Sequence, residues 1–563
     1  MATTRRTFVK QAGAAGILLA TSDRIGELLA QSAPGEVMKS KFKGLADIAL
    51  AEAKRGGCSY ADIRFTRNIN YAGVTATASN GAPAADPAAG FGGRGGGGRA
   101  GGGGGRGGGG RGGGGFGGGD TISGDGSPNA AGFGVRVVHS GVFGFASSPI
   151  VTEDEIRRIS RLATEVARAS AIAKKRDLIL APVPAYQVNW STEMTQDPRK
   201  MSDADKQRGL QAVVDAAIKH KDVTSATASA NFSGEWKYFA SSEGSYIEQE
   251  LFSTMPNFSV TAKRGDQTRT RQYAMPGGMG GWELVEIDGM MANVDQTVDE
   301  AIELGTATPL VPGVKDLILA PSHLALTIHE IIAHATELDR IMGYEANYAG
   351  TSFVKLDSIN KLKYGTKLLN VTGDKVRPGG RATIGYDDDG VKTTKFDIIK
   401  DGILVGVSSN RETAHYIGDK ASRGCTQASG WAQYPFLRMP NVHLEADPKG
   451  PTPEEMIANV KDGILIEGSG SFSIDQQRYN GQFGGSAFWE IKNGKKGKAL
   501  TNVTYNAITT DFWGNLQAVA GPKYWRQFGV GGDAKGQPTQ GQAVSHGASW
   551  CHISKIMCGG AYQ

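Results

Sequence analysis

The sequence predicts an α+β protein, with an α/β amino-terminal domain followed by a β-rich carboxy-terminal domain that carries a helix of candidate metal ligands. Helix-period and strand-period segments alternate in the first half, which indicates helices packed on a sheet. Later, Asp-Gly and Asn-Gly turns between alternating runs predict β-hairpins at 387–390, 400–402 and 492–494. A length of 563 residues predicts two or more cores. We place the boundary near Val311, giving domains of 38–310 and 311–563.

Residues 1–33 have the features of a twin-arginine signal segment. Two consecutive arginines at 5–6 precede a short, weakly apolar run at 12–20. That run is too short to span a membrane as a helix, and no later stretch is long and apolar enough to do so. We therefore expect export by the twin-arginine route to a periplasmic or extracellular location, with cleavage between Ser22 and Ala33. An ordinary basic terminus is the alternative.

In the amino-terminal domain, apolar residues that recur with the helical period predict four helices. These helices span 39–53, 152–173, 203–221 and 291–304. Alternating segments predict strands between them. The strands are expected at 58–66, as a strand–turn–strand within 132–148, at 224–232 and at 246–253.

Residues 81–129 form a low-complexity insert rich in glycine and arginine. Such a composition cannot bury enough apolar surface to order itself, so we expect a long flexible loop within the amino-terminal domain. The tract also resembles RGG segments, which bind RNA through charge and stacking. Because export would separate the chain from such ligands, the sequence argues against nucleic-acid binding.

The overall composition is that of a soluble globular protein, with 39% hydrophobic and 21% charged residues. The net charge of +5 is small and does not indicate a polyanionic partner. The four cysteines show no CxxC spacing and do not predict a disulfide framework, despite the expected export.

The stretch from Ser322 to Met342 carries the residues from which a function can be argued. A short apolar strand, Val314–Ala320, is expected to lead into one helix, with Ser322 as its N-cap and Gly343 at its end. One stripe, roughly 120° wide on a helical wheel, holds the apolar residues Leu324, Ile328, Ile331, Ile332, Ala335, Leu338 and Met342. The opposite face holds the titratable residues His329, Glu330, His334 and Glu337. The sequence thus predicts a helix anchored by one face and carrying a polar site on the other.

The spacing of the two histidines differs from that of ordinary zinc proteases. In H-E-x-x-H the histidines are four residues apart, and both imidazoles reach one ion. His329 and His334 are five apart, about 140° around an ideal helix, which is too wide for a straight helix. A π-bulge would realign them; otherwise they belong to a solvated polar face and share no ion. Glu330 favours a shared ion, because metal-assisted hydrolysis needs a carboxylate to take a proton from bound water.

Further blocks extend the pattern beyond this helix. They are CSYADIRFTR (58–67), GFGVRVVHSGVFGFASS (132–148), IGYDDDGV (384–391), RMPNVHLE (438–445), FWEIKNGK (488–495) and KGQPTQGQAVSHGA (535–548). In this order, from about Lys39 to Ile556 and interrupted by the insert, they resemble the TldD/PmbA (TldD/TldE) family, putative modulators of DNA gyrase that behave as metalloproteases. HEIIAHATELD, at 329–339, is similar to the HExxxH motif of the TldD-type subunit, which the PmbA-type subunit lacks.

This resemblance implies roles for individual residues. His329 and His334 would be zinc ligands, and Glu330 would be the general base. The third ligand of the family is a cysteine in a block C-G-K-G-Q-P, and this chain has Asp533 in its position. Two histidines and one carboxylate are still a common catalytic zinc set, although the harder oxygen ligand also suits manganese, iron or cobalt. Glu337 is expected either to orient a histidine or to be plain surface charge. Rival third ligands are Cys551, His546 and His552.

The function implied by the resemblance is that of a metalloprotease acting on unfolded or modified peptides inside a chamber enclosed by a dimer. The partner would be a PmbA/TldE-type subunit or a second copy of the chain. Three alternatives remain open from the sequence. They are an inactive metal-binding subunit, suggested by Asp533; a binding module built on the glycine–arginine tract; and a hydrolase of another amide.

Overall fold

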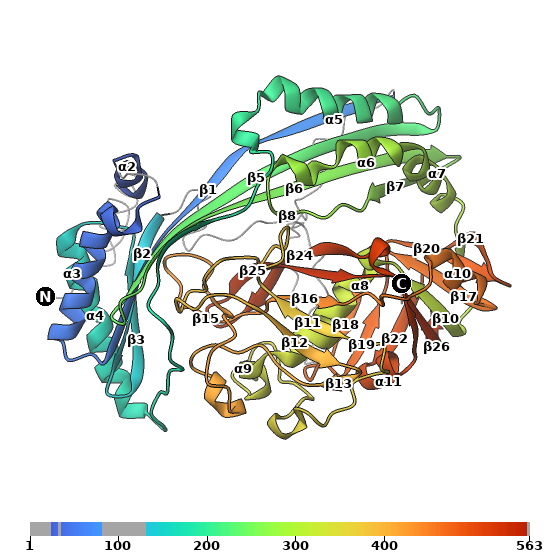
Figure 1. The fold of residues 1–563 in the computed structure, drawn as a ribbon. Helices are drawn as coiled ribbons and strands as arrows, with labels where there is room; N and C mark the ends of the chain where they lie inside the picture. The colour runs from blue at the N-terminus through green and yellow to red at the C-terminus, as the bar shows by residue number, and fades with distance from the viewer. Residues whose placement is uncertain (1–23, 32–34, 81–130, 560–563) are drawn as a thin grey trace, which may run out of the picture.

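The computed structural model describes residues 24–31, 35–80 and 131–559, which form two halves built on separate sheets (Figure 1). The glycine-rich insert and residues 1–23 of the expected leader lie outside these residues. The predicted α+β class is confirmed, because helices flank a mixed sheet in the first half and strands dominate the second. The long strands of the first sheet arch over the carboxy-terminal half.

The amino-terminal sheet has eight strands, in the order β3-β2-β1-β5-β6-β4, with β7 and β8 also paired to β6. Three of its strands, β1, β5 and β6, are about twice as long as the sequence predicted, or longer. Pairing along β1 and β5 carries the strands through asparagine and glycine positions of low strand propensity. The strands are β1 (Tyr60–Ser79), β2 (Ala131–His139), β3 (Val142–Ser148), β4 (Gln187–Ser191), β5 (Val223–Ser241), β6 (Tyr246–Arg264), β7 (Gln267–Tyr273) and β8 (Gly278–Met279).

Helices pack near both ends of this sheet (Figure 1). Ser40, Thr152 and Ser202 begin three of them, and each side-chain oxygen accepts a backbone N–H. The helix predicted at 291–304 is two helices, because the chain leaves helical geometry at Asn293. The helices are α2 (Arg24–Ala30), α3 (Lys41–Arg55), α4 (Glu153–Ser170), α5 (Asp203–Ala217), α6 (Ile287–Ala292) and α7 (Val294–Leu304). Among the described residues, the structure contains no helix with the length and apolarity needed to cross a membrane.

Helix α2 lies within the segment expected to be a signal. Its Ile25 and Leu28 are buried in the same core as Phe42 and Ile63. Cleavage beyond Ala30 would remove this packing, so removal of a leader close to Ser22 would preserve the core.

The carboxy-terminal half is built around a ten-stranded sheet, in the order β18-β19-β22-β26-β10-β17-β20-β21-β9, with β23 also paired to β26. Its strands are β9 (Thr308–Pro309), β10 (Gly313–Leu319), β17 (Asp462–Glu467), β18 (Phe472–Ile474), β19 (Asn480–Phe483), β20 (Ala487–Lys492), β21 (Lys495–Thr501), β22 (Thr504–Ile508), β23 (Leu516–Val519) and β26 (Cys551–Gly559). Two short helices, α10 (Pro453–Ala458) and α11 (Thr509–Gly514), accompany it.

Together with smaller sheets, the ten-stranded sheet forms a half-barrel around helix α8 (Pro321–Ile328). This helix contacts β16, β17, β24 and β25. A four-stranded sheet has the order β13-β12-β11-β16, and β14–β15 and β24–β25 form two-stranded ribbons. These strands are β11 (Val371–Asp374), β12 (Lys395–Lys400), β13 (Ile403–Leu404), β14 (Thr426–Gln427), β15 (Phe436–Leu437), β16 (Asn441–Leu444), β24 (Arg526–Lys535) and β25 (Gln540–Ala548).

Two of the three predicted hairpin turns are confirmed. Asp401-Gly402 joins β12 to β13 and Asn493-Gly494 joins β20 to β21, with all four residues at positive φ. The turn at 387–390 is different, because it closes only a single bridge between Tyr386 and Lys392. Its three aspartates are buried, which a solvent-exposed hairpin turn would not allow.

These aspartates form ion pairs that join the two halves of the protein. Asp388 lies 3.2 Å from Nζ of Lys237 and 3.6 Å from Nη1 of Arg64, both on the amino-terminal sheet. Asp389 accepts a hydrogen bond of 2.7 Å from Arg136. Burial alone would raise the pKa of Asp388, but Lys237 and Arg64 outweigh burial and lower it. The charged turn therefore fixes the carboxy-terminal half against the first sheet.

Replacing Asp388 should destabilise the protein strongly. Asp388→Ala removes the anion that Lys237 and Arg64 share, and breaking such a buried pair costs about 3–5 kcal/mol. Chemical denaturation should show this loss. Glu153→Ala, which removes an exposed helical ion pair to Arg157, should change stability by about 0.5 kcal/mol or less. Equal effects of the two substitutions would contradict the role given to Asp388.

Candidate metal centre

The site begins where strand β10 feeds into helix α8. Helix α8 starts at Pro321, with Ala320 as its N-cap, so the prediction that Ser322 is the N-cap is wrong. Proline is well suited to this first helical position because its missing N–H has no partner there in any case. Ser322 instead accepts a hydrogen bond from the amide of Gly468, which ties the helix to the end of β17.

The expected single helix from 322 to 342 is interrupted. Glu337 adopts extended backbone angles, φ −81° and ψ 119°, and pairs with Ser408. A short helix, α9 (Leu338–Ile341), follows and gives way to Gly343 at φ 82°, the left-handed residue predicted for the end. The break separates the histidines from the residues that follow and redirects the side chain of Glu337.

Between α8 and the break the chain forms a π-helical turn, His329–Ala333. The amide of His334 donates to the carbonyl of His329, a bond that spans five residues. This turn is the bulge that the sequence required for convergence, and it brings the two imidazole centroids to 4.6 Å. The carbonyl of Ile331 accepts a hydrogen bond of 2.6 Å from the Tyr364 hydroxyl.

The polar face of this stretch is not solvated. The alternative that His329 and His334 lie on a surface is therefore wrong, and so is the alternative that Glu337 is surface charge. All the candidate side chains are buried, as is the apolar stripe behind them. The buried set comprises His329, Glu330, His334, Glu337 and Asp533.

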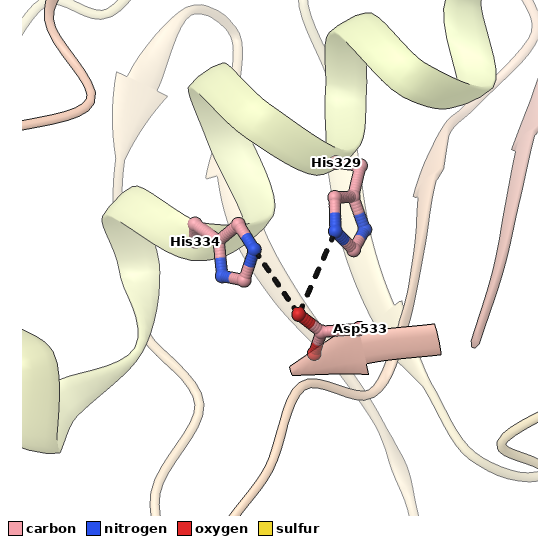
Figure 2. A group of neighbouring side chains, drawn as sticks. All are labelled: His329, His334 and Asp533. Atoms are coloured by element: carbon pink, nitrogen blue, oxygen red, sulfur yellow. Dashed lines mark ion pairs between the residues drawn. The ribbon is translucent and has the colours of Figure 1, made fainter. Parts of the chain in front are cut away.

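Asp533 lies opposite the two histidines, on strand β24 (Figure 2). Its Oδ1 is 3.3 Å from Nε2 of His334 and 3.8 Å from Nε2 of His329. A shift in the pairing of β24 with β25 between Val530 and Asp533 accommodates two glycines, and such bulges re-aim side chains. The ligand atoms of the three residues all lie within 4.8 Å of one another.

Arg438 holds the other side of this carboxylate. Its Nη2 donates to the Asp533 carbonyl at 2.7 Å and to Oδ2 at 3.1 Å. Burial opposes ionisation of Asp533, but His334 and Arg438 hold its pKa well below the usual range. Asp533 is therefore a fixed anion whose Oδ1 faces the histidines.

His546 determines which nitrogen of His329 carries the proton. His546 Nδ1 lies 3.0 Å from the Val442 carbonyl, which can only accept, so this nitrogen is protonated. Burial holds the pKa of His546 well below its usual value, so its Nε2 accepts from His329 Nδ1 at 2.9 Å. Burial also lowers the pKa of His329 to about 3. His329 is therefore neutral and presents the lone pair of Nε2 toward Asp533.

His334 is oriented by a carboxylate instead. Its Nδ1 donates to Glu337 at 2.9 Å, which leaves Nε2 directed at Asp533. Lys535 and Arg340 also donate to Glu337, at 2.8 and 3.2 Å. Burial alone would raise the pKa of Glu337, but these two cations hold it well below its usual value. An ionised carboxylate behind a histidine is the arrangement that makes imidazole a strong metal ligand.

These three side chains fit a metal ion. Zinc bonds of about 2.1 Å in a tetrahedron place neighbouring ligand atoms about 3.4 Å apart. The observed separations from Asp533 Oδ1, 3.3 and 3.8 Å, are close to that value. Both imidazoles direct Nε2 at the same carboxylate, and their Nδ1 atoms are engaged elsewhere. The donor set of two nitrogens and one oxygen therefore suits a catalytic ion with a further position open.

The rival third ligands lie elsewhere. Cys551 is buried on β26, where its thiol contacts the Ser549 carbonyl, and burial raises its pKa. His552 pairs with Asp316 at 3.1 Å. Neither belongs to the group formed by His329, His334 and Asp533, which is the one group of such residues found within the described part of the chain.

Several contacts at the site had no signal in the sequence. Arg438 and Lys535 belong to blocks that resemble the family, but no pattern assigned them a role. Arg478, which lies 3.6 Å from Glu330, stands in no motif of the sequence. Single arginines and lysines distant in the chain acquire such partners only through the fold. His546 was predicted as a rival ligand, and the structure instead places it behind His329.

The fold and the site together define a class: an α+β protein with a buried centre of two histidines and one carboxylate on a helix that contains a π-turn. Comparison with known families then identifies the family within this class. The PmbA/TldA metallopeptidase central domain matches residues 196–307, and the PmbA/TldA metallopeptidase C-terminal domain matches residues 312–557. The chain belongs to the TldD/PmbA family and is a metalloprotease.

Curated relatives agree with this assignment. A metalloprotease of Synechocystis sp. is 29% identical over 437 residues, which cover 77% of this chain and 89% of the relative. A zinc metalloprotease TldD homolog of Saccharolobus solfataricus is 22% identical over 439 residues, covering 76% and 90% respectively.

Solved structures share the fold at low sequence identity. A putative modulator of a DNA gyrase from Thermotoga maritima aligns with a TM-score of 0.66 at 14% identity, covering 92% of this chain and 100% of that one. TldE from Thermococcus kodakarensis aligns with a TM-score of 0.63 at 13% identity, covering 91% and 99%.

Removing the carboxylate should abolish tight metal binding. Asp533→Ala leaves two histidines, so bound zinc should fall from about one ion per chain to well below one after dialysis, because catalytic zinc sites use three protein ligands. Elemental analysis of the purified proteins measures this. Cys551→Ser should retain the ion. Loss of metal from Cys551→Ser, with retention in Asp533→Ala, would reverse the assignment.

Removing the acceptor behind His329 should weaken metal binding without abolishing it. His546→Phe deprives His329 Nδ1–H of its partner, and losses of this kind reduce metal affinity about 10–100-fold. Competition with a chromogenic chelator measures the change. His552→Phe alters a histidine outside the cluster and serves as the control. Equal affinities for His546→Phe and the unmodified protein would show that His546 does not orient His329.

Proposed function

We propose that the protein hydrolyses peptide bonds at a catalytic ion held by His329, His334 and Asp533, with Glu330 as the general base. The observation that carries this proposal is the convergence of both Nε2 atoms on Asp533 beside a buried carboxylate. A bound ion would polarise the scissile carbonyl and lower the pKa of a water molecule. Zinc is the ion we favour, with manganese, iron or cobalt as alternatives because an oxygen ligand replaces the family cysteine.

Glu330 has the position and freedom required of a base. It follows His329 in the π-turn, and its side chain is 5% exposed. Its Oε2 makes no hydrogen bond to any described residue. A carboxylate that is buried and not committed to the fold is available to take a proton from water and pass it to the departing amine.

The substrate class follows from the burial of the site. We propose that unfolded or modified peptides are cleaved, since a folded substrate could not bring a scissile bond to residues so enclosed. A dimer with a TldE-type subunit, or with a second copy of the chain, would complete the chamber. We further propose export by the twin-arginine route to the periplasm or cell exterior, on the strength of the arginine pair at 5–6.

A metal-binding but inactive subunit is the second candidate, because Asp533 stands where the family has cysteine. The structure favours activity over this candidate in one respect. Asp533 is ionised, held by Arg438 and directed at both histidines, so the replacement retains an anionic ligand.

The decisive experiment replaces the base and leaves the ligands in place. Glu330→Gln should lower the rate of cleavage of an unstructured, fluorogenically labelled peptide by about 10²–10⁴-fold, because it removes proton transfer. Metal content should be unchanged, since Glu330 is not a ligand. Glu153→Gln, at an exposed residue of helix α4 in the amino-terminal half, controls for general damage. Equal low activity in the unmodified metal-loaded protein and Glu330→Gln would favour the inactive subunit.

A further inference from the structure

The turn between β18 and β19 places an arginine beside Glu330. Arg478 has φ 61°, a left-handed conformation that residues with a side chain rarely adopt. The carboxylate of Asp475 holds this turn by accepting three backbone amides. They are the amides of Gln477, Tyr479 and Asn480. The fold therefore maintains a strained backbone whose effect is to direct one guanidinium at the metal centre.

The contacts of this guanidinium are incomplete. Its Nη2 donates to the Ala349 carbonyl at 3.3 Å, and its Nη1 lies 3.6 Å from Glu330 Oε2, too far for a hydrogen bond. Its Nε has no hydrogen-bond partner among the described residues. The side chain is only 11% exposed. A guanidinium carries five N–H donors, so most of its capacity is directed to no group of the described chain.

The other buried cations of the centre behave differently. Arg438 donates directly to the Asp533 carboxylate, and Lys535 donates to both Glu337 and Asp339. These contacts are direct hydrogen bonds of 2.8–3.1 Å to carboxylates, as expected of groups that stabilise and orient the ligands, although Nε of Arg438, like that of Arg478, has no hydrogen-bond partner among the described residues. Arg478 approaches its carboxylate without bonding to it. This difference indicates that the guanidinium of Arg478 is available to bind a ligand that enters the site.

We propose that Arg478 is a catalytic residue that binds the carbonyl oxygen of the scissile peptide and stabilises the negative charge that develops there. This inference rests on the peptidase function proposed above. The chemical class of its ligand is the tetrahedral oxyanion of a peptide bond under attack by water. Preorganised donors directed at such an oxygen in a buried site are among the largest contributions to catalysis.

The proton balance explains why Arg478 faces the base. Before attack, the guanidinium of Arg478 lies beside the carboxylate of Glu330, with Nη1 3.6 Å from Oε2. Water then bonds to the carbonyl carbon, its proton passes to Glu330, and the carbonyl electron pair moves to the substrate oxygen. The negative charge thus leaves Glu330 and appears on that oxygen, so the arginine exchanges one anionic partner for another. The electron pair on that oxygen then re-forms the C=O bond and the C–N bond breaks. The C–N pair stays on nitrogen, which takes the proton from Glu330.

The test compares Arg478→Met, Arg478→Lys and the unmodified full-length protein, all loaded with zinc. Arg478→Met should lower kcat for an unstructured peptide by about 10²–10³-fold with KM changed less than threefold, the cost of losing one oxyanion donor. Arg478→Lys should recover part of the loss because it restores a cation. Gln477→Ala, in the same turn but exposed, is the matched control.

A binding measurement separates this role from a structural one. A phosphinic peptide carries a charged tetrahedral oxygen, whereas the matching ketomethylene peptide carries a neutral carbonyl. Calorimetry should show that Arg478→Met weakens the phosphinic peptide by about 10²-fold, in line with the kinetic loss, and the ketomethylene peptide by less than threefold. Zinc content should be unchanged.

The remaining outcomes contradict either the role of Arg478 or the proposed peptidase function. If Arg478→Met matches the unmodified protein, or if it loses zinc or weakens both peptides equally, Arg478 is not an oxyanion donor. If Arg478→Met does not fold, the same selective loss must appear, in smaller degree, in Arg478→Lys, and its absence overturns the inference. An unmodified protein that neither cleaves peptides nor binds the phosphinic peptide overturns the proposed function itself.

Discussion

The metal centre depends on one backbone hydrogen bond, from the amide of His334 to the carbonyl of His329. An α-helix would leave these imidazoles about 140° apart, so no third residue could bring them to one ion. The π-turn closes that angle, and its geometry is supported from outside the helix by Tyr364, which donates to Ile331. Burial of the surrounding leucines and isoleucines holds the turn in place. The packing of the core therefore fixes the relative positions of the two imidazoles, because it holds the π-turn that brings them together.

The carboxylates around this turn are each paired with a nearby cation. Four carboxylates face the centre or stand directly behind it, and each lies within 4 Å of a buried cation. The pairs are Asp533 with Arg438, Glu337 with Arg340 and Lys535, Asp339 with Lys535, and Glu330 with Arg478. Buried carboxylates without such partners would take up protons and cease to act as ligands or bases. Arg340 and Lys535 hold the pKa of Glu337, and His334 and Arg438 that of Asp533, well below the usual range, so the candidate site stays anionic where an ion would bind.

The sequence was most informative where the chemistry is local. The five-residue spacing of His329 and His334 required either a π-turn or separate histidines, and the structure shows the π-turn. The sequence could not predict the break at Glu337, because the extended backbone of Glu337 comes from pairing with Ser408, which is distant in the chain. Asp533 emerged only through resemblance to a family block, since one aspartate among glycines carries no ligand pattern. Arg438 and Arg478 had no signal because their partners are brought together by tertiary structure alone.

A short segment, 408–411, links the amino-terminal half to the stretch that carries the histidines. Ser408 pairs with Glu337, the residue that orients His334. Three residues later, Arg411 donates to Glu243 and to the carbonyl of Ala181, both in the amino-terminal half. The Arg411 amide also contacts Asp389, in the aspartate turn that fixes the two halves together. Both ends of this segment are buried and hydrogen-bonded. The segment therefore connects Glu337, which orients His334, to the contacts that hold the two halves together. The first sheet thus contributes rigidity to a site to which it supplies no ligand.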